Sequence, residues 1–167
     1  MKEGIVVYGF PACGKTTLFE KYSNSKTFID LESSNYQYIL TKKQMQMPVE
    51  ARKGTIRKVN PEWPNNYFKA IMESVKKYDF VFVAHTGIVW CAENNIPYWR
   101  IFPDYSCKEE YLKRMKDRGN SEHFLNSLEV NFDKYIEECY NDDKCERKIV
   151  LHKGEFIEDA FRSLHLL

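Results

Sequence analysis

An unbroken glycine-rich motif near the N-terminus constrains the fold more than any other feature of the sequence. Residues 9–16 read Gly-Phe-Pro-Ala-Cys-Gly-Lys-Thr, which matches the pattern G-x-x-x-x-G-K-[ST] without a gap. A short apolar run, Ile5 to Tyr8, precedes the motif, and an amphipathic helical pattern follows it. A buried strand, a glycine-rich turn and a helix N-terminus in this order form the context in which backbone amides surround a phosphate group. The motif therefore predicts a binding site for a nucleoside triphosphate.

The residue types of this loop suggest separate roles. Lys15 is expected to reach the β- and γ-phosphates, and the hydroxyl of Thr16 is placed to hold Mg²⁺. Cys13 either fills space in the loop or, at a helix N-terminus, has a lowered pKa and a redox role. The residues expected to bind ATP are Pro11, Ala12, Cys13, Gly14, Lys15, Thr16 and Thr17.

The rest of the chain alternates between strand and helix patterns. Apolar runs predict strands at residues 5–8, 27–30, 80–84, 98–102 and 148–151. Helical spacing of apolar residues appears at 16–22, 67–75, 111–115, 124–136 and 156–164. Ser106 to Glu109 read as a capping box that opens the third of these helices, and Gly119 as its end. We expect one α/β domain over 1–167, with a five-stranded parallel sheet and helices on both faces, in the three-layer P-loop arrangement.

A long segment interrupts this alternation. Residues 31–78 separate the second and third predicted strands, whereas an ordinary crossover needs far fewer residues. The segment holds polar, basic and methionine-rich stretches followed by Asn-Pro-Glu-Trp-Pro at 60–64. We interpret it as a small subdomain or lid beside the sheet.

Charge and composition exclude several partners and compartments. The chain has 25 Lys and Arg against 24 Asp and Glu, so a net charge of +1 gives no general electrostatic case for nucleic acid or a membrane surface. No apolar run has the length of a membrane span, and the N-terminus lacks the pattern of a signal peptide. The five cysteines form no C-x-x-C pair. We expect a cytoplasmic monomer or homodimer with reduced cysteines, whose partner is a small-molecule phosphoryl acceptor.

Other nucleotide-binding classes fit the sequence poorly. The guanine-reading motif N-K-x-D of GTPases is absent, and the third predicted strand ends in Ala-His-Thr-Gly at 84–87 without the acidic residue of large ATPases. With these removed, the layout resembles the nucleoside monophosphate kinase family, in the broad sense that includes adenylate kinases and shikimate- and gluconate-type kinases. It looks most like small kinase-like proteins of phages and prophages. The resemblance covers nearly the whole chain and implies a substrate-binding insertion after the second strand and a basic lid, here about 104–125, after the fourth.

Asp30 ends the second predicted strand, at the edge where open α/β sheets bind ligands. It resembles the aspartate at the same place in shikimate-type kinases. A carboxylate there can act as general base, orient the acceptor, or hold Mg²⁺ through water. Glu32 and Ser33 are secondary candidates, with Ser33 a possible substrate ligand. The alternative is a turn in which Asp30 and Ser33 cap a helix.

The resemblance also implies arginines in the insertion and the lid. Arg52 is the first choice to grip an acceptor phosphate, although solvation of a surface side chain explains such a residue equally well. Arg114 and Arg118 lie four apart on one predicted helix and are assigned to catalysis, with a solvated basic face as the alternative. His85 ends the third strand and either contacts the substrate or is a satisfied structural histidine.

Three functions remain open on the sequence alone. The leading hypothesis is an ATP-dependent kinase of a nucleoside or deoxynucleoside monophosphate, with Mg²⁺ as cofactor. The second is a kinase of a hydroxyl-bearing metabolite or nucleoside, in which Asp30 is an essential base. The third is an ATP-binding module without catalysis.

Overall fold

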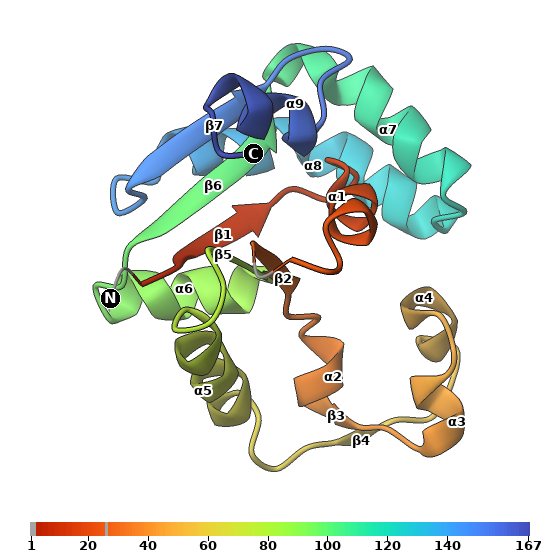
Figure 1. Ribbon diagram of the computed structural model, residues 1–167. Coiled ribbons are helices and arrows are strands. Elements are labelled where there is room, and N and C mark those ends of the chain that lie inside the picture. The colour runs from red at the N-terminus through yellow and green to blue at the C-terminus, as the bar shows by residue number, and fades with distance from the viewer. Residues whose placement is uncertain (1–2, 26) are drawn as a thin grey trace.

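A five-stranded parallel sheet forms the centre of the molecule in the computed structural model, which describes residues 3–25 and 27–167 (Figure 1). Its order is β2-β5-β1-β6-β7, and every neighbouring pair is parallel. The strands are β1 (Ile5–Gly9), β2 (Phe28–Asp30), β5 (Phe80–Val83), β6 (Tyr98–Pro103) and β7 (Arg147–Leu151). All five predicted strands are confirmed, because each is a short apolar run that the sheet buries.

The register of these strands brings three segments to one edge of the sheet. Tyr8 lies opposite Val83, and Asp30 lies opposite Phe82, so β1, β5 and β2 end at nearly the same level. In a parallel sheet this carboxyl edge is where ligands bind. The motif after β1, the residues after β5 and the end of β2 therefore face the same region.

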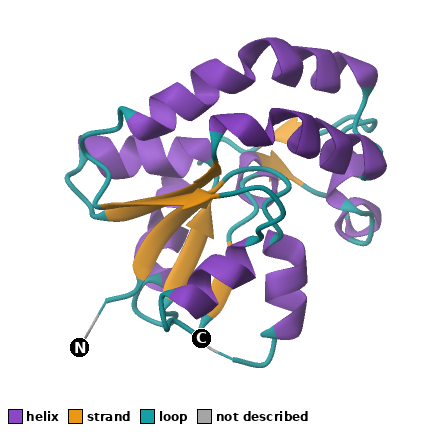
Figure 2. Cartoon of the chain, turned by 90° about the horizontal axis from the view of Figure 1, so that it is seen from above, coloured by secondary structure: helices purple, strands orange, loops and turns teal. Residues whose placement is uncertain are grey.

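Helices cover both faces of the sheet, as Figure 2 shows in the view from above. On one face, α1 (Lys15–Lys21) and α9 (Ile157–Ser163) pack their apolar side chains against alternate residues of β1, β5 and β6. On the other face lie α5 (Asn65–Ser74), α6 (His85–Glu93), α7 (Lys108–Asp117) and α8 (Glu122–Tyr140). None of the helices in the described part of the chain combines the length and apolarity that a membrane crossing demands.

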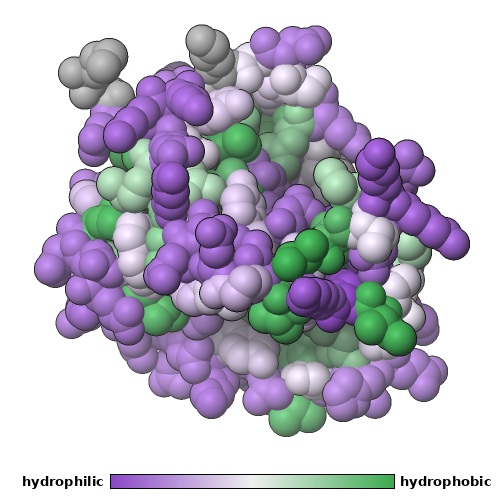
Figure 3. Space-filling view, turned by 90° about the horizontal axis from the view of Figure 1, so that it is seen from below, coloured by the Kyte–Doolittle hydropathy of each residue, from purple (hydrophilic) through white to green (hydrophobic). Residues whose placement is uncertain are grey.

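The outer part of the insertion lies below the sheet in Figure 1. It contains α2 (Ser34–Gln37), β3 (Tyr38–Ile39), α3 (Lys42–Met45), α4 (Val49–Arg52) and β4 (Lys58–Val59), and β3 pairs with β4 in an antiparallel ribbon. Viewed from below, the surface of the molecule is mostly hydrophilic with separate hydrophobic patches (Figure 3). The chain then returns through α5, which packs against the sheet.

Two local expectations need correction. The capping box at Ser106 is wrong: the Asp104 side chain instead accepts a hydrogen bond from the Ser106 amide and caps a 3₁₀ turn, η1 (Tyr105–Cys107), so α7 begins only at Lys108. The sequence analysis also did not identify α6, whose first residue is His85. The predicted end of α7 is confirmed, because Gly119 has a φ of 83° and its amide binds the Lys116 carbonyl.

Candidate nucleotide and phosphoryl-transfer site

The glycine-rich loop connects β1 directly to α1. Gly14 has a φ of 96° and Ala12 a φ of 62°, so the backbone turns through the left-handed region at two points. The amine of Lys15 donates a hydrogen bond of 2.6 Å to the Gly9 carbonyl. A Cβ added at Gly9 would lie 2.9 Å from the Lys15 side chain, so a glycine leaves the room that this lysine needs to lie across the loop.

Cys13 has a structural place in the loop. Its side chain is fully buried, and its carbonyl accepts a hydrogen bond of 2.9 Å from the Ile157 amide of α9. Burial raises the pKa of its thiol, while the nearby Lys15 opposes this rise. A thiol that stays protonated is a poor nucleophile, so the arrangement favours the space-filling role over the redox one.

Arg114 of α7 reaches the loop from the opposite face of the sheet. Its guanidinium donates hydrogen bonds to the carbonyls of Ala12 (3.2 Å) and Glu155 (3.1 Å) and forms an ion pair with Glu110. It also lies 3.9 Å from the centre of the Phe156 ring. The structure therefore brings one of the two predicted lid arginines to the phosphate-binding loop, in a position fixed by several contacts.

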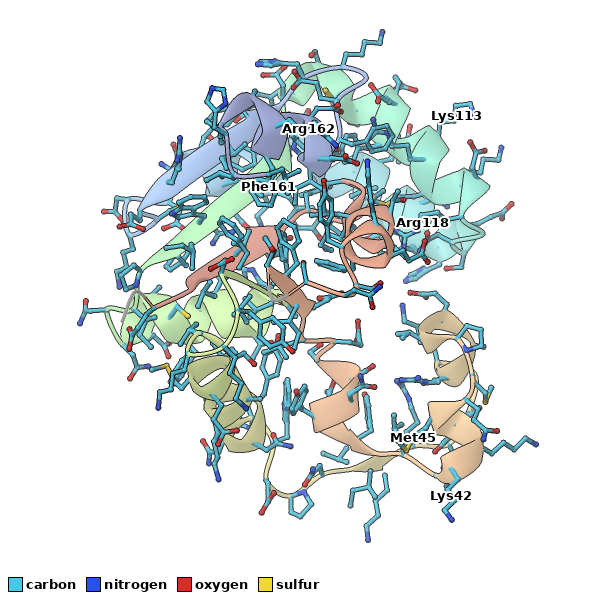
Figure 4. All side chains as sticks on the ribbon, viewed as in Figure 1. Lys42, Met45, Lys113, Arg118, Phe161 and Arg162 are labelled. Atoms are coloured by element: carbon cyan, nitrogen blue, oxygen red, sulfur yellow. The ribbon has the colours of Figure 1, made fainter. Side chains whose placement is uncertain are left out.

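Arg118 lies one turn further along α7 and is exposed. Figure 4 shows it at the end of α7 that lies above α4 of the insertion. Its guanidinium has no hydrogen-bond partner within the described part of the chain. Among the predicted lid arginines, Arg118 is thus the one whose charge is available to a ligand.

The side chain of Asp30 is exposed, yet the pKa of its carboxyl is raised. Desolvation by the surrounding protein raises this pKa to about 6. Lys15 lowers this pKa and Glu32 raises it further. Asp30 ends β2 at the sheet edge where the glycine-rich loop leads into Lys15, and an opposite charge there favours the ionised carboxylate. A carboxylate with this pKa is a stronger base than an ordinary aspartate and is still ionised at neutral pH.

The residues at this edge fit a magnesium ion that binds together with a nucleotide. Thr16 is exposed in the first turn of α1, and Asp30 supplies a carboxylate at the end of β2, on the same edge of the sheet. Mg²⁺ typically takes one or two protein oxygens and completes its shell with phosphates and water. In the described residues no group of three or more His, Cys, Asp or Glu side chains gathers into a metal site, so such an ion would depend on the phosphates.

Tyr67 fixes the point where the insertion leaves and rejoins the sheet. Its hydroxyl donates to the Leu31 carbonyl (3.0 Å) and accepts from the Ala84 amide (2.9 Å), which joins the residues after β2 and β5. Tyr36 and Trp63 pack against its ring, with centroid distances of 5.2 and 5.5 Å. Tyr67 is fully buried, so its ring belongs to the core.

Two predicted substrate ligands, Arg52 and Ser33, lie in or next to the short helices of the insertion. Arg52 is buried, and its guanidinium donates to the carbonyls of Met45 and Met47 and to the Asn35 side chain. These contacts hold α3 and α4 to α2 and leave the guanidinium little capacity for a phosphate. Ser33 is the N-cap residue of α2 without a side-chain cap, and Glu32 instead accepts from the Ser34 amide.

His85 lies at the mouth of a cavity of about 280 Å³ beside the loop. The sheet contributes Tyr8 and Arg100 to this cavity, and the loop contributes Phe10 and Pro11. The remaining lining residues come from α8: Phe124, Ser127, Leu128, Tyr135, Glu138 and Cys139.

The sequence analysis missed Arg100, which is buried in the middle of β6. Its guanidinium forms an ion pair of 2.5 Å with Asp142, just after α8, and lies 5.5 Å from the Tyr8 ring centre. Hydrogen bonds from Arg100 and Tyr98 hold the pKa of Asp142 below its usual range, although burial acts in the opposite direction. A lone arginine within an apolar strand was the signal that could have identified this pair.

Comparisons with known proteins identify the fold. No protein-family model matches the sequence, and no curated protein matches it. A gluconokinase from Sinorhizobium meliloti 1021 has a similar structure, with a TM-score of 0.51 at 14% identity over 96% of this chain and 88% of that one. An uncharacterized protein from Eubacterium ventriosum ATCC 27560 gives a TM-score of 0.48 at 14% identity, over 99% and 98% of the two chains. At this identity the likeness to the gluconokinase shows the fold alone: an α/β fold of the P-loop kinase type.

Proposed function

We propose that the chain is an ATP-dependent phosphotransferase that acts on a small molecule. One observation supports this proposal most directly. Asp30 lies within electrostatic reach of Lys15, at the edge of the sheet where the glycine-rich loop lies. A phosphate-binding lysine beside a basic carboxylate supplies the two groups that transfer to an acceptor requires. The fold shared with a gluconokinase supports the same proposal.

Each group has a role in the transfer step. The loop amides and Lys15 bind the β- and γ-phosphates of ATP, and Arg118 adds positive charge near the transferring group. Thr16, together with the phosphates, would hold Mg²⁺, which would supply charge neutralisation at the leaving group. Asp30 takes the proton of the acceptor hydroxyl, the acceptor oxygen bonds to the γ-phosphorus, and the bond to the β–γ bridging oxygen breaks to release ADP.

A hydroxyl-bearing acceptor fits this geometry better than a monophosphate. A hydroxyl needs a base, and the raised pKa of Asp30 suits that task. A monophosphate needs a cation in the insertion, but the guanidinium of Arg52 is already bound to two carbonyls and an amide. A nucleoside monophosphate remains the second candidate, because the exposed guanidinium of Arg118 offers one cation to an anionic acceptor.

An assay of ADP release tests the proposal. ATP and Mg²⁺ are supplied with nucleosides, sugar acids and nucleoside monophosphates in turn, with the Lys15→Ala variant as the blank. We expect release that depends on a hydroxyl acceptor. Asp30→Asn should lower this turnover by about 10²- to 10⁴-fold while ATP binding is retained, whereas the neighbouring change Glu32→Gln should cost much less.

Other outcomes would redirect the assignment. Turnover only with monophosphates, unaffected by Asp30→Asn, would overturn the hydroxyl acceptor. ATP binding without transfer to any acceptor would favour a non-catalytic module. Loss of ATP binding in the Lys15→Ala variant alone would confirm the nucleotide site without deciding the acceptor.

A further inference from the structure

The cavity between α6 and α8 is placed where an acceptor can reach the phosphate-binding loop. Its floor is the sheet face formed by Tyr8 and Arg100, and Pro11 of the loop borders it directly. His85 forms its wall on the side of β5, the strand next to the end of β2. A molecule bound here has one end against the loop and the other against α8.

The shape and lining of the cavity favour a flat, apolar ligand. Four of its eleven lining residues carry phenyl or phenol rings: Tyr8, Phe10, Phe124 and Tyr135. Such rings gain most from stacking or edge contacts with another planar ring. A volume of about 280 Å³ lies at the small end of the range for ligand pockets, which suits one ring system with a small substituent.

The charges around the cavity argue against an anionic ligand. The guanidinium of Arg100 is neutralised by Asp142, so this buried cation offers no net attraction. Glu138 also lines the cavity and is exposed, with no hydrogen-bond partner within residues 3–25 and 27–167. An ionised carboxylate only accepts hydrogen bonds, so it favours N–H or O–H donors and repels carboxylate or phosphate groups.

We propose that this cavity binds the uncharged planar part of the phosphoryl acceptor, and that the acceptor is a nucleoside-like compound with N–H donors directed at Glu138. This inference rests on the proposed transferase function and names the substrate class of the same site. It disfavours a sugar acid, whose carboxylate would meet Glu138 and find no free cation in the cavity.

A binding experiment on α8 tests the proposal without requiring turnover. Adenosine, guanosine, cytidine, thymidine and gluconate are titrated into the full-length protein by calorimetry. Ser127→Trp places an indole at the cavity from an exposed position, and Val130→Trp places one on the same helix at a residue that is 81% exposed and outside the lining. We expect at least one nucleoside to bind. Ser127→Trp should weaken its binding at least tenfold, and Val130→Trp should leave its binding unchanged.

A second pair of variants tests the contact with Glu138. Glu138→Gln should weaken binding of the preferred nucleoside about tenfold and reduce the discrimination against gluconate. Glu137→Gln changes the neighbouring exposed carboxylate and should have neither effect. Preferential binding of gluconate, or equal effects of Ser127→Trp and Val130→Trp, would overturn the proposal. So would the absence of binding by every nucleoside.

The two proposals can fail separately. ATP binding and acceptor-independent ATP hydrolysis are measured on the same variants. If ATP does not bind, the transferase function fails whatever the nucleosides do. If ATP is turned over with an acceptor whose KM ignores Ser127→Trp, the transferase function holds and the cavity is not its acceptor site.

Discussion

At the scale of single residues, the pKa values of two acidic side chains are shifted in opposite directions. The pKa of Asp30 is raised because its carboxylate loses solvation with only partial compensation from Lys15. The pKa of Asp142 is lowered because Arg100 and Tyr98 donate hydrogen bonds to it. The carboxylate of Asp30 therefore has the raised pKa that suits a base, whereas the carboxylate of Asp142 has its hydrogen bonds filled and is structural.

As the base in the proposed transfer, Asp30 should give the acceptor-dependent rate a pH dependence centred near pH 6. A base acts only when ionised, so acceptor-dependent kcat/KM should rise with pH through about 6 and level off above it. A rate that stays constant from pH 5 to 8 with the preferred acceptor would contradict the role of Asp30 as base.

The same carboxyl should make the stability of the fold decrease with pH over the range in which the proposed activity increases. Because the pKa of this carboxyl is higher in the folded state than in the unfolded chain, the folded state binds the proton more tightly, and the stabilisation is lost as pH rises through about 6. At pH 7.5 the melting temperature of Asp30→Asn should therefore equal or exceed that of the wild type. A clear fall, with Glu32→Gln as the control, would contradict this assignment.

Removal of Asp142 should be costly because it leaves a buried cation unpaired. The side chains of Arg100 and Asp142 are each only 11% exposed. We expect Asp142→Asn to lower the free energy of unfolding by about 3 kcal/mol in urea denaturation. Asp143→Asn, an exposed neighbour, should change it little, and equal effects of the two variants would contradict the account.

At the scale of elements, the outer insertion is held by hydrogen bonds of buried polar side chains, Arg52 and Gln44, rather than by an apolar core. α2, α3 and α4 are each four residues long, too short to be stable alone, and the buried guanidinium of Arg52 joins them. The glycine-rich loop is supported differently, through contacts with α7 and α9 from both faces of the sheet.

Arg52→Met should loosen the outer insertion. The change leaves two carbonyls and the Asn35 amide oxygen without their donors, at a cost of about 1–3 kcal/mol in local stability. Hydrogen exchange at residues 42–59 should accelerate accordingly, while exchange in β1 and β5 stays unchanged. The exposed neighbour Lys53 provides the control Lys53→Met. Similar exchange in the two variants would show that Arg52 does not hold α2, α3 and α4 together.

The elements that sequence predicted are those with a local signal. The five strands are continuous apolar runs, and the loop motif specifies its own geometry. α6 was not identified, because its apolar residues include both buried Ile88 and exposed Val89 and no side chain caps its start. The contacts of Arg52 and Arg100 join residues far apart in the chain, and the cavity draws its lining from the sheet, the loop and two helices, so no short pattern reveals them.

At the scale of the whole molecule, stability is concentrated in the sheet. Apolar side chains pack on both of its faces, whereas β3 and β4 form a two-stranded ribbon with exposed residues such as Ile39 and Val59. A two-stranded ribbon has little stability of its own. The molecule therefore combines a rigid sheet with a weaker appendage.

Hydrogen exchange should separate these two parts. Amides of β1, β5 and β6 are expected to exchange at the rate of global unfolding, and those of β3 and β4 at least tenfold faster, because they open locally. Global unfolding followed by circular dichroism supplies the reference. Protection of β3 and β4 equal to that of β1 would show that the insertion belongs to the same cooperative unit.

The hydroxyl of Tyr67 joins the chain ends after β2 and β5, at the root of the insertion. The segment from α2 to β4 is therefore joined to the sheet at one place, where this tyrosine holds the residues after β2 and β5 together. The outer insertion is thus an exchangeable module: a segment of another length or composition can replace it without rebuilding the strands. A descendant of this chain can therefore change the outer insertion while it inherits the carboxyl edge of the sheet intact.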